Sequence, residues 1–258
     1  MARSKDNLIV GLTTFNHEFL KISVSGLGRV GKNVTLIIYN DNPCRKLTHR
    51  ALRRMGFHGR VHVINGNENL GQFGARMSTI EYVQKNNLDS PWFMFANDDD
   101  IVLNTSVPNI DENNYAVMGN AVIIAKRVLD VLRVMENPND YTIDGADTHL
   151  IAPHIAMSGT FIRMAYLREF AEFMSKITSQ LSDIILELPF AVPVDLFMWH
   201  MFVEYMRVTH PQMSPIYMNQ TNYLMTKLNN TRHPTTDQCN GIVGRTVSIV
   251  SAALRGNE

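Results

Sequence analysis

Short apolar stretches alternate with helix-forming patterns along the first hundred residues, and this alternation constrains the fold more than any other feature. Strands that are joined by helices lie parallel, because a helical crossover returns the chain to the same end of the sheet. The pattern therefore predicts an α/β fold with a Rossmann-like, mostly parallel central sheet flanked by helices. The expected strands are residues 8–12, 34–39, 61–64 and 92–96, and the expected helices are residues 16–27, 43–55 and 72–84.

The pattern is looser beyond residue 100. No repeat, low-complexity tract or linker divides the chain, so we expect one domain over residues 1–258. Residues 1–104 form its nucleotide-binding half in this interpretation, and residues 105–258 its acceptor and catalytic half. The expected strands there are 115–118, 160–163 and 214–218, the expected helices are 126–135, 167–174, 196–206 and 246–254, and residues 219–240 are expected to be polar and rich in turns.

The composition argues against two classes of partner. The 24 basic and 24 acidic residues cancel, so total charge indicates neither a nucleic-acid partner nor a membrane surface. No apolar leader follows Met1 and no stretch is long and apolar enough to span a bilayer, so we expect a cytoplasmic protein. Cys44 and Cys239 lack a metal-ligand spacing and are interpreted as reduced thiols.

Three adjacent carboxylates, Asp98, Asp99 and Asp100, follow the apolar stretch at residues 92–96. If the chain stays extended, side chains alternate, and Asp98 and Asp100 share a face that Asp99 does not. Two like charges on one face favour a hard divalent cation such as Mg²⁺ or Mn²⁺ between them. The alternative is a solvated turn that ends the strand.

Residues 26–31, Gly-Leu-Gly-Arg-Val-Gly, match the dinucleotide-binding pattern G-x-G-x-x-G. In that fold the pattern opens a helix, and an acidic residue follows about 20 positions later. Only Lys32 and Asn33 separate Gly31 from the next expected strand, and Asp41 comes too early. The context therefore rejects an NAD-dependent oxidoreductase.

Four motifs together resemble a GT-A type glycosyltransferase, closest in style to family 2. The resemblance covers the first half of the chain well and the second half loosely, and one departure is Asn40-Asp41, where the family usually has two acids. It implies that the first two motifs hold the nucleoside, that the arginine approaches base or phosphate, and that the acids bind ribose and metal. The motifs are Thr13-Thr14-Phe15-Asn16, Asn40-Asp41-Asn42, Asn69-Leu70-Gly71 with Ala75-Arg76, and Asn97-Asp98-Asp99-Asp100, which assign Thr13, Phe15, Asn16, Asp41, Arg76, Asp98 and Asp100.

The activity implied by this resemblance is transfer of a sugar from a nucleotide-diphosphate donor, UDP-linked, to an unknown acceptor. Mn²⁺ or Mg²⁺ would neutralise the departing diphosphate. Inversion is favoured over retention and needs a general base, for which Asp195 is the candidate and Asp144 and Asp147 are the alternatives. Apolar neighbours would raise the pKa of Asp195, whereas the helix that it opens would lower it. The family often places a second acid before this one, where this chain has Val194.

Two other classes stay open on the sequence alone: a nucleotidyltransferase that uses a nucleoside triphosphate and a sugar phosphate, and a nucleotide-sugar-binding protein without catalysis. The polar residues 219–240 add a further prediction. We expect them to close over the donor, with His233 as an extra metal ligand and Lys227 or Arg232 facing the diphosphate. The alternative is a passive surface loop.

Overall fold

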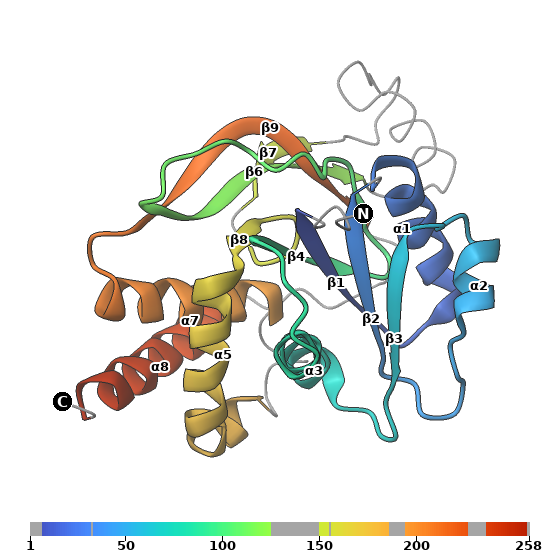
Figure 1. The fold of residues 1–258 in the computed structure, drawn as a ribbon. Helices are drawn as coiled ribbons and strands as arrows, with labels where there is room; N and C mark the ends of the chain where they lie inside the picture. Colours follow the sequence, from blue (N-terminus) through green and yellow to red (C-terminus); the bar gives the residue numbers. More distant parts are fainter. Residues whose placement is uncertain are drawn as a thin grey trace.

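The computed structural model describes residues 7–31, 33–124, 150–154, 156–185, 194–226 and 236–256. Its first half confirms the predicted alternation of strands and helices. Four parallel strands lie in the order β3-β2-β1-β4, and helices connect them across the sheet (Figure 1). The elements are β1 (Leu8–Thr14), α1 (His17–Val30), β2 (Val34–Asn40), α2 (His49–Arg54), β3 (Arg60–Asn65), α3 (Gly71–Lys85) and β4 (Trp92–Asn97).

The second half extends the same sheet with mixed pairing. Beyond β4 the order continues β8-β6-β9-β5, with β7 paired to β6. The β4–β8 and β8–β6 pairs are antiparallel, and β6 and β9 are parallel. The elements are β5 (Ile101–Val102), β6 (Asn114–Ile124), β7 (Leu150–Pro153), β8 (Phe161–Arg163), α5 (Met164–Ile177), η1 (Thr178–Leu181), α7 (Val194–Thr209), β9 (Ser214–Thr226) and α8 (Thr236–Arg255).

Alternate residues of the buried strands pack into two different cores. Leu8, Val10 and Leu12 of β1 face α1 and α2, whereas Ile9 joins the core that contains α3, α5, α7 and α8. This alternation is the period of two that a strand imposes, and it explains why strands covered on both faces are apolar throughout. Figure 1 shows α3, α5, α7 and α8 together, away from α1 and α2.

The predicted helix 43–55 is wrong at its beginning. The helix is only α2, and Thr48 caps it by accepting a hydrogen bond from the Ala51 amide at 3.2 Å. Asn42, which precedes the predicted helix, accepts from the Cys44 amide at 3.0 Å and donates to the Phe15 carbonyl at 3.1 Å. A local side-chain bond therefore competed successfully with helix initiation.

The expected polar stretch 219–240 is also wrong at both ends. Strand β9 continues to Thr226, with Asn222, Tyr223 and Leu224 buried, and α8 begins at Thr236, ten residues before the predicted start. Pairing with β6 gives backbone partners to Thr221 and to residues 223–226, and it outweighs the polar composition of this stretch. Lys227, Arg232 and His233 lie outside the described residues, as do the helix predicted at 126–135 and Asp144 and Asp147.

The glycine pattern at residues 26–31 lies at the end of α1, with Gly31 as its C-cap. A Cβ at Gly28 would come within 2.3 Å of the Gly56 carbonyl oxygen, so the pattern serves close packing of α1 on the turn after α2. The rejection of the dinucleotide fingerprint is therefore confirmed. No helix in the described part of the chain combines the length and the apolar character that crossing a bilayer requires.

Candidate active site

Three parallel strands end together at one edge of the sheet. Thr14, Asn40 and Asn97 are the last residues of β1, β2 and β4, and the register pairs Thr14 with Asn40 and Thr13 with Asn97. In open α/β sheets, ligands bind outside this carboxyl edge. Thr13 itself is buried within β1.

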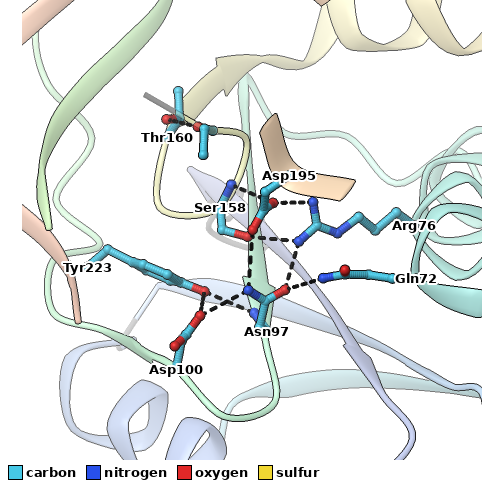
Figure 2. A network of polar contacts seen from close by, with 9 residues as sticks. Gln72, Arg76, Asn97, Asp100, Ser158, Thr160, Asp195 and Tyr223 are labelled. Carbon is cyan, nitrogen blue, oxygen red and sulfur yellow. Dashed lines mark hydrogen bonds and ion pairs between the residues drawn. The ribbon is translucent and has the colours of Figure 1, made fainter. Parts of the chain in front are cut away.

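A buried ion pair lies at the centre of this edge. Arg76 of α3 is 0% exposed, and its Nη1 donates to Oδ1 of Asp195 in the first turn of α7, although 119 residues separate them in sequence. Its Nη2 donates to Oδ1 of Asn97 at 2.7 Å and to Oγ of Ser158 at 2.9 Å, and the guanidinium lies 5.2 Å from the centre of the Phe95 ring. Figure 2 shows how these side chains converge from four separate segments. Arg76 is therefore a structural cation of the site and not a solvated helix residue.

The two oxygens of Asp195 differ in their partners. Oδ1 accepts from Arg76, from the Ser158 amide at 3.3 Å and from the Ser158 hydroxyl at 2.8 Å. Oδ2 has one long contact, with Asn97 Nδ2 at 3.3 Å. Burial raises the pKa of Asp195, but the charge and hydrogen bonds of Arg76 and the Ser158 hydrogen bond outweigh it, so the pKa is lowered. Burial thus acts in the expected direction, but the net pKa is lowered, and the cause is the charge and hydrogen bonds of Arg76 and Ser158.

Asp100 is held by a second set of contacts that Figure 2 also shows. Its Oδ2 accepts from Asn97 Nδ2 at 2.9 Å and from the Tyr223 hydroxyl at 3.1 Å. The same hydroxyl accepts from the Asn97 backbone amide at 3.0 Å, so Tyr223 of β9 links both halves of the sheet. Burial and the Asp100 charge raise the pKa of Tyr223, which keeps its proton as the donor. The His154 ring stacks on Tyr223 at 5.7 Å, and burial lowers the pKa of His154.

Asp98 is bound to the loop between β1 and α1. Its Oδ2 accepts from the Thr14 hydroxyl at 2.7 Å, and it also accepts from the backbone amides of Phe15 and Asn16. Asn16 caps α1 by accepting from the Glu18 amide. The Phe15 ring is 53% exposed at this edge. The structure thus brings Asp98, Phe15 and Asn16 together.

The argument that paired Asp98 with Asp100 on one strand face is wrong. Strand β4 ends at Asn97 and residues 98–100 form a turn, so the alternation of an extended segment does not apply. Asp99, which was expected to face away, lies near enough to other acids to feel their charges. Burial and the charge of Asp98 raise the pKa of Asp99 to about 6, with a smaller contribution from Asp195.

Asp41 follows β2 and closes the loop before α3. Its Oδ1 accepts from the Leu70 amide at 2.7 Å, and it also accepts from the Gly71 amide at the start of α3. Burial raises the pKa of Asp41. Gly71 has φ +67°, a conformation that glycine adopts without strain. The second and third sequence motifs therefore meet through this carboxylate.

The acids of this edge fit a divalent cation. In the described part of the chain no three His, Cys, Asp or Glu side chains form a preassembled metal cluster. Three carboxylates nevertheless follow β4, a fourth comes from α7, and carboxylate oxygens are the ligands that Mg²⁺ and Mn²⁺ prefer. These four carboxylates belong to Asp98, Asp99, Asp100 and Asp195, and Asp195 is the one paired with Arg76.

Sequence reasoning missed four residues of the network. Asn97 was quoted only as part of a motif, yet it contacts Gln72 at 2.8 Å as well as the residues described above. Ser158 lies just before the expected strand at 160–163, outside any expected element, and Tyr223 lies in the stretch expected to be polar and rich in turns. No local signal marks Ser158 or Gln72, because their roles depend on contacts across the fold.

A protein-family model described as "Glycosyl transferase family 2" matches residues 10–170. The match includes every motif of the first half and extends through β8 into α5. No curated protein matches the sequence.

Solved structures resemble the fold at low sequence identity. A crystal structure of S. aureus TarS 1-349 superposes with a TM-score of 0.51 and 12% identity, over 96% of this chain and 65% of that one. The mannosyltransferase PcManGT from Pyrobaculum calidifontis, in complex with GDP-Man and Mn²⁺, gives a TM-score of 0.44 and 9% identity, over 98% and 75% of the two chains. The first likeness supports the fold alone, and the second is too weak to carry an argument.

Proposed function

The chain belongs to glycosyl transferase family 2, and on this premise we propose that it is metal-dependent, uses a nucleoside-diphosphate donor and inverts the anomeric centre. The predicted GT-A fold and the glycosyltransferase class are confirmed. The observation that carries the finer proposal is the cluster of carboxylates at the carboxyl edge of β4. We propose a UDP-linked sugar as the donor and leave the acceptor open.

The donor would lie between the loops that follow β1 and β2. Asp98, anchored by the Thr14 hydroxyl and two backbone amides, is placed to accept from ribose hydroxyls. The exposed Phe15 ring offers an apolar face for the base, and Asp41 an acceptor beside it. Thr13 lies near the end of β1 and Asn16 in the loop that follows, so these assignments fall on one edge of the sheet.

Asp98 and Asp100 would hold the metal, with Asp99 as a third carboxylate and His233 as the further ligand predicted from sequence. When bound, Mn²⁺ or Mg²⁺ would act as a Lewis acid and neutralise the departing diphosphate. Asp99 is consistent with this role because burial, and after it the negative charge of Asp98, raises the pKa of this carboxyl, and a bound cation would offset both.

Asp195 would take the proton from the acceptor hydroxyl through Oδ2. Oδ1 is bound to Arg76 and Ser158, whereas among the described residues Oδ2 has only the long contact with Asn97. The side chain is 15% exposed, which leaves it open to an acceptor. A lowered pKa keeps the carboxylate ionised at neutral pH, at some cost in basicity.

Arg76 would position this base. Its guanidinium fixes Asp195, Asn97 and Ser158 relative to one another. The predicted contact of Arg76 with base or phosphate would require the guanidinium to give up part of this buried network. We therefore expect Arg76 to act mainly through Asp195.

The test measures nucleoside diphosphate released from UDP-sugars and GDP-sugars, with Mn²⁺ or with EDTA. We expect UDP release that EDTA abolishes and that Asp98→Asn and Asp100→Asn reduce at least tenfold, since each removes an anionic ligand. Asp183→Asn, at an exposed position, is the matched control. Undiminished release in EDTA would contradict metal dependence, and pyrophosphate as the product would indicate nucleotidyl transfer. The anomeric configuration of the product, read by NMR, tests inversion.

A further inference from the structure

A cationic stripe covers the outer edge of the sheet at α2. It consists of five exposed side chains: Arg45, Lys46, Arg50, Arg53 and Arg54. Residues 42–67 contain six of the 24 basic residues of the chain and none of its 24 acidic residues. A chain without net charge has therefore concentrated positive charge on one edge.

Helix stability does not account for this stripe. Arg53 and Arg54 lie in the last turn of α2, where cations favour the helix dipole. Arg50, however, is the second residue of the helix, and Arg45 and Lys46 come just before it, where cations oppose the dipole. No acid lies in the first turn to balance them. Three of the five charges thus oppose the local structure.

Intramolecular pairing does not account for the stripe either. In the described part of the chain, the five side chains form no ion pair and no hydrogen bond with a protein group. Arg45 forms a hydrogen bond through its backbone, since its carbonyl accepts from Asn40 Nδ2 at 2.7 Å. The charges are therefore directed to solvent and available to a partner.

The stripe runs along the height of the sheet. The Asn40 contact places its beginning at the carboxyl end of β2, and α2 carries it back towards the start of β3, the edge strand (Figure 1). The close approach of Gly28 to Gly56 adds the exposed Arg29 from the end of α1. The cations therefore follow the connection that runs from the carboxyl end of β2 to the start of β3.

We propose that this stripe binds the phosphate backbone of a nucleic acid. Four of its five residues are arginines, whose planar guanidinium matches phosphate oxygens two at a time. A line of cations fits a linear polyanion. An anionic membrane fits less well, since stable attachment takes a second, apolar signal. The exposed large apolar residues of the described chain, Phe15, Leu70 and Tyr217, are not in the stripe.

Binding of this kind is independent of base sequence and sensitive to salt. If three to five phosphates are neutralised, the slope of log K against log salt is about −3 to −4.5, and the dissociation constant lies at about 10⁻⁴ to 10⁻⁶ M near physiological salt. The stripe lies beside the proposed donor residues and includes none of them, so donor binding is expected to be unchanged. The inference does not rest on the proposed function.

The test is fluorescence anisotropy of a labelled 20-base-pair DNA duplex titrated with the full chain at several salt concentrations. The variant is Arg50→Gln/Arg53→Gln/Arg54→Gln. Its control, Lys21→Gln/Lys85→Gln/Lys176→Gln, removes the same charge from exposed positions elsewhere. We expect the stripe variant to weaken binding at least tenfold and to reduce the salt slope by about 2 to 3, and the control to change binding less than twofold. Circular dichroism checks that α2 and the fold persist.

Three results would overturn the proposal. In the first, the parent chain fails to bind the duplex at low salt. In the second, both triple variants weaken binding equally, which would mean that binding depends on net charge alone and not on the stripe. In the third result, vesicles that contain phosphatidylglycerol bind the parent chain more tightly than DNA does, and the stripe variant no longer binds the vesicles. That result would assign the stripe to an anionic lipid surface.

Discussion

Arg76 and the arginines of α2 are the same residue type under opposite conditions. Arg76 is 0% exposed and contacts Asp195, Asn97 and Ser158, whereas Arg50, Arg53 and Arg54 are exposed and make no such contacts with the residues that the structure describes. Transfer of a cation from water to the interior is costly, so a buried arginine is tolerated only with close anionic and polar partners. An exposed one adds almost nothing to folding and stays available for a partner. The comparison predicts large stability effects in the network and small ones on the stripe.

The largest expected effect is that of Arg76→Met. Asp195 would keep its place but lose its cation, and a broken buried pair costs about 3–5 kcal/mol in the free energy of unfolding. Urea denaturation measures the loss. Lys85→Met, at the exposed end of the same helix, is the control. The double variant Arg76→Met/Asp195→Leu should recover much of the stability, and a loss below about 1 kcal/mol in the single variant would contradict our account.

Asp195→Asn should lower turnover by about a hundredfold or more, the usual contribution of a positioned acid-base group. Affinity for UDP with Mn²⁺ should change little, because the donor residues lie on other loops. Turnover should be measured well below the melting temperature of the variant, because Arg76 loses its anionic partner and the fold is less stable. Activity that survives here but is lost in Asp144→Asn or Asp147→Asn would transfer the role of base to one of those acids.

Tyr223→Phe should cost about 1–2 kcal/mol, since the Asn97 amide and the Asp100 carboxylate both lose a hydrogen-bond partner. Thermal unfolding reports the change. The comparison is Tyr217→Phe on the same strand, where the residue is 42% exposed and the hydroxyl donates one hydrogen bond, to Asn120 Oδ1, that water can replace. Equal losses of stability in both variants would show that the hydrogen bonds of the Tyr223 hydroxyl contribute no more than those of an exposed tyrosine.

Asp99→Asn should stabilise the protein at neutral pH. The folded protein raises the pKa of this carboxyl from 3.8 to about 6, so it binds the proton more tightly than the unfolded chain does. The cost of ionising Asp99 is absent below about pH 4 and complete above its folded pKa. We expect a gain of about 1–2 kcal/mol at pH 8 that vanishes near pH 4, with partial exposure limiting its size. Urea denaturation without metal at pH 8 and at pH 4 measures this gain, and a gain that is independent of pH would contradict the prediction.

The smallest expected effect belongs to the stripe. Replacing Arg50, Arg53 and Arg54 with Gln should change the unfolding free energy by less than about 0.5 kcal/mol per residue, because no native contact is lost. The same urea curves measure it beside those of Arg76→Met. A loss comparable to that of Arg76→Met would mean that the stripe serves the fold and that the two regions do not differ.

Local pattern predicted the first half of the fold correctly. The strands at 8–12, 34–39, 61–64 and 92–96 are present within a few residues, because runs buried on both faces carry an unmistakable apolar signal. The same alternation placed the ends of β1, β2 and β4 at one edge, and with them the region of the site. The beginning of α2 and the length of β9 were not predicted. Asn42 accepts a local hydrogen bond from the Cys44 amide, and the polar end of β9 pairs with β6.

By itself the sequence determined the alternation of strands and helices, the acids after β4 and the cationic run at residues 42–67, since each depends on neighbours along the chain. Tertiary structure alone decided which charges were buried. It joined Arg76 to Asp195 across 119 residues, inserted Ser158 between them and brought Tyr223 to Asp100. The physical reason is that desolvation and hydrogen bonding act through space, so identical arginines become a buried support or an exposed stripe according to what the folded chain places around them.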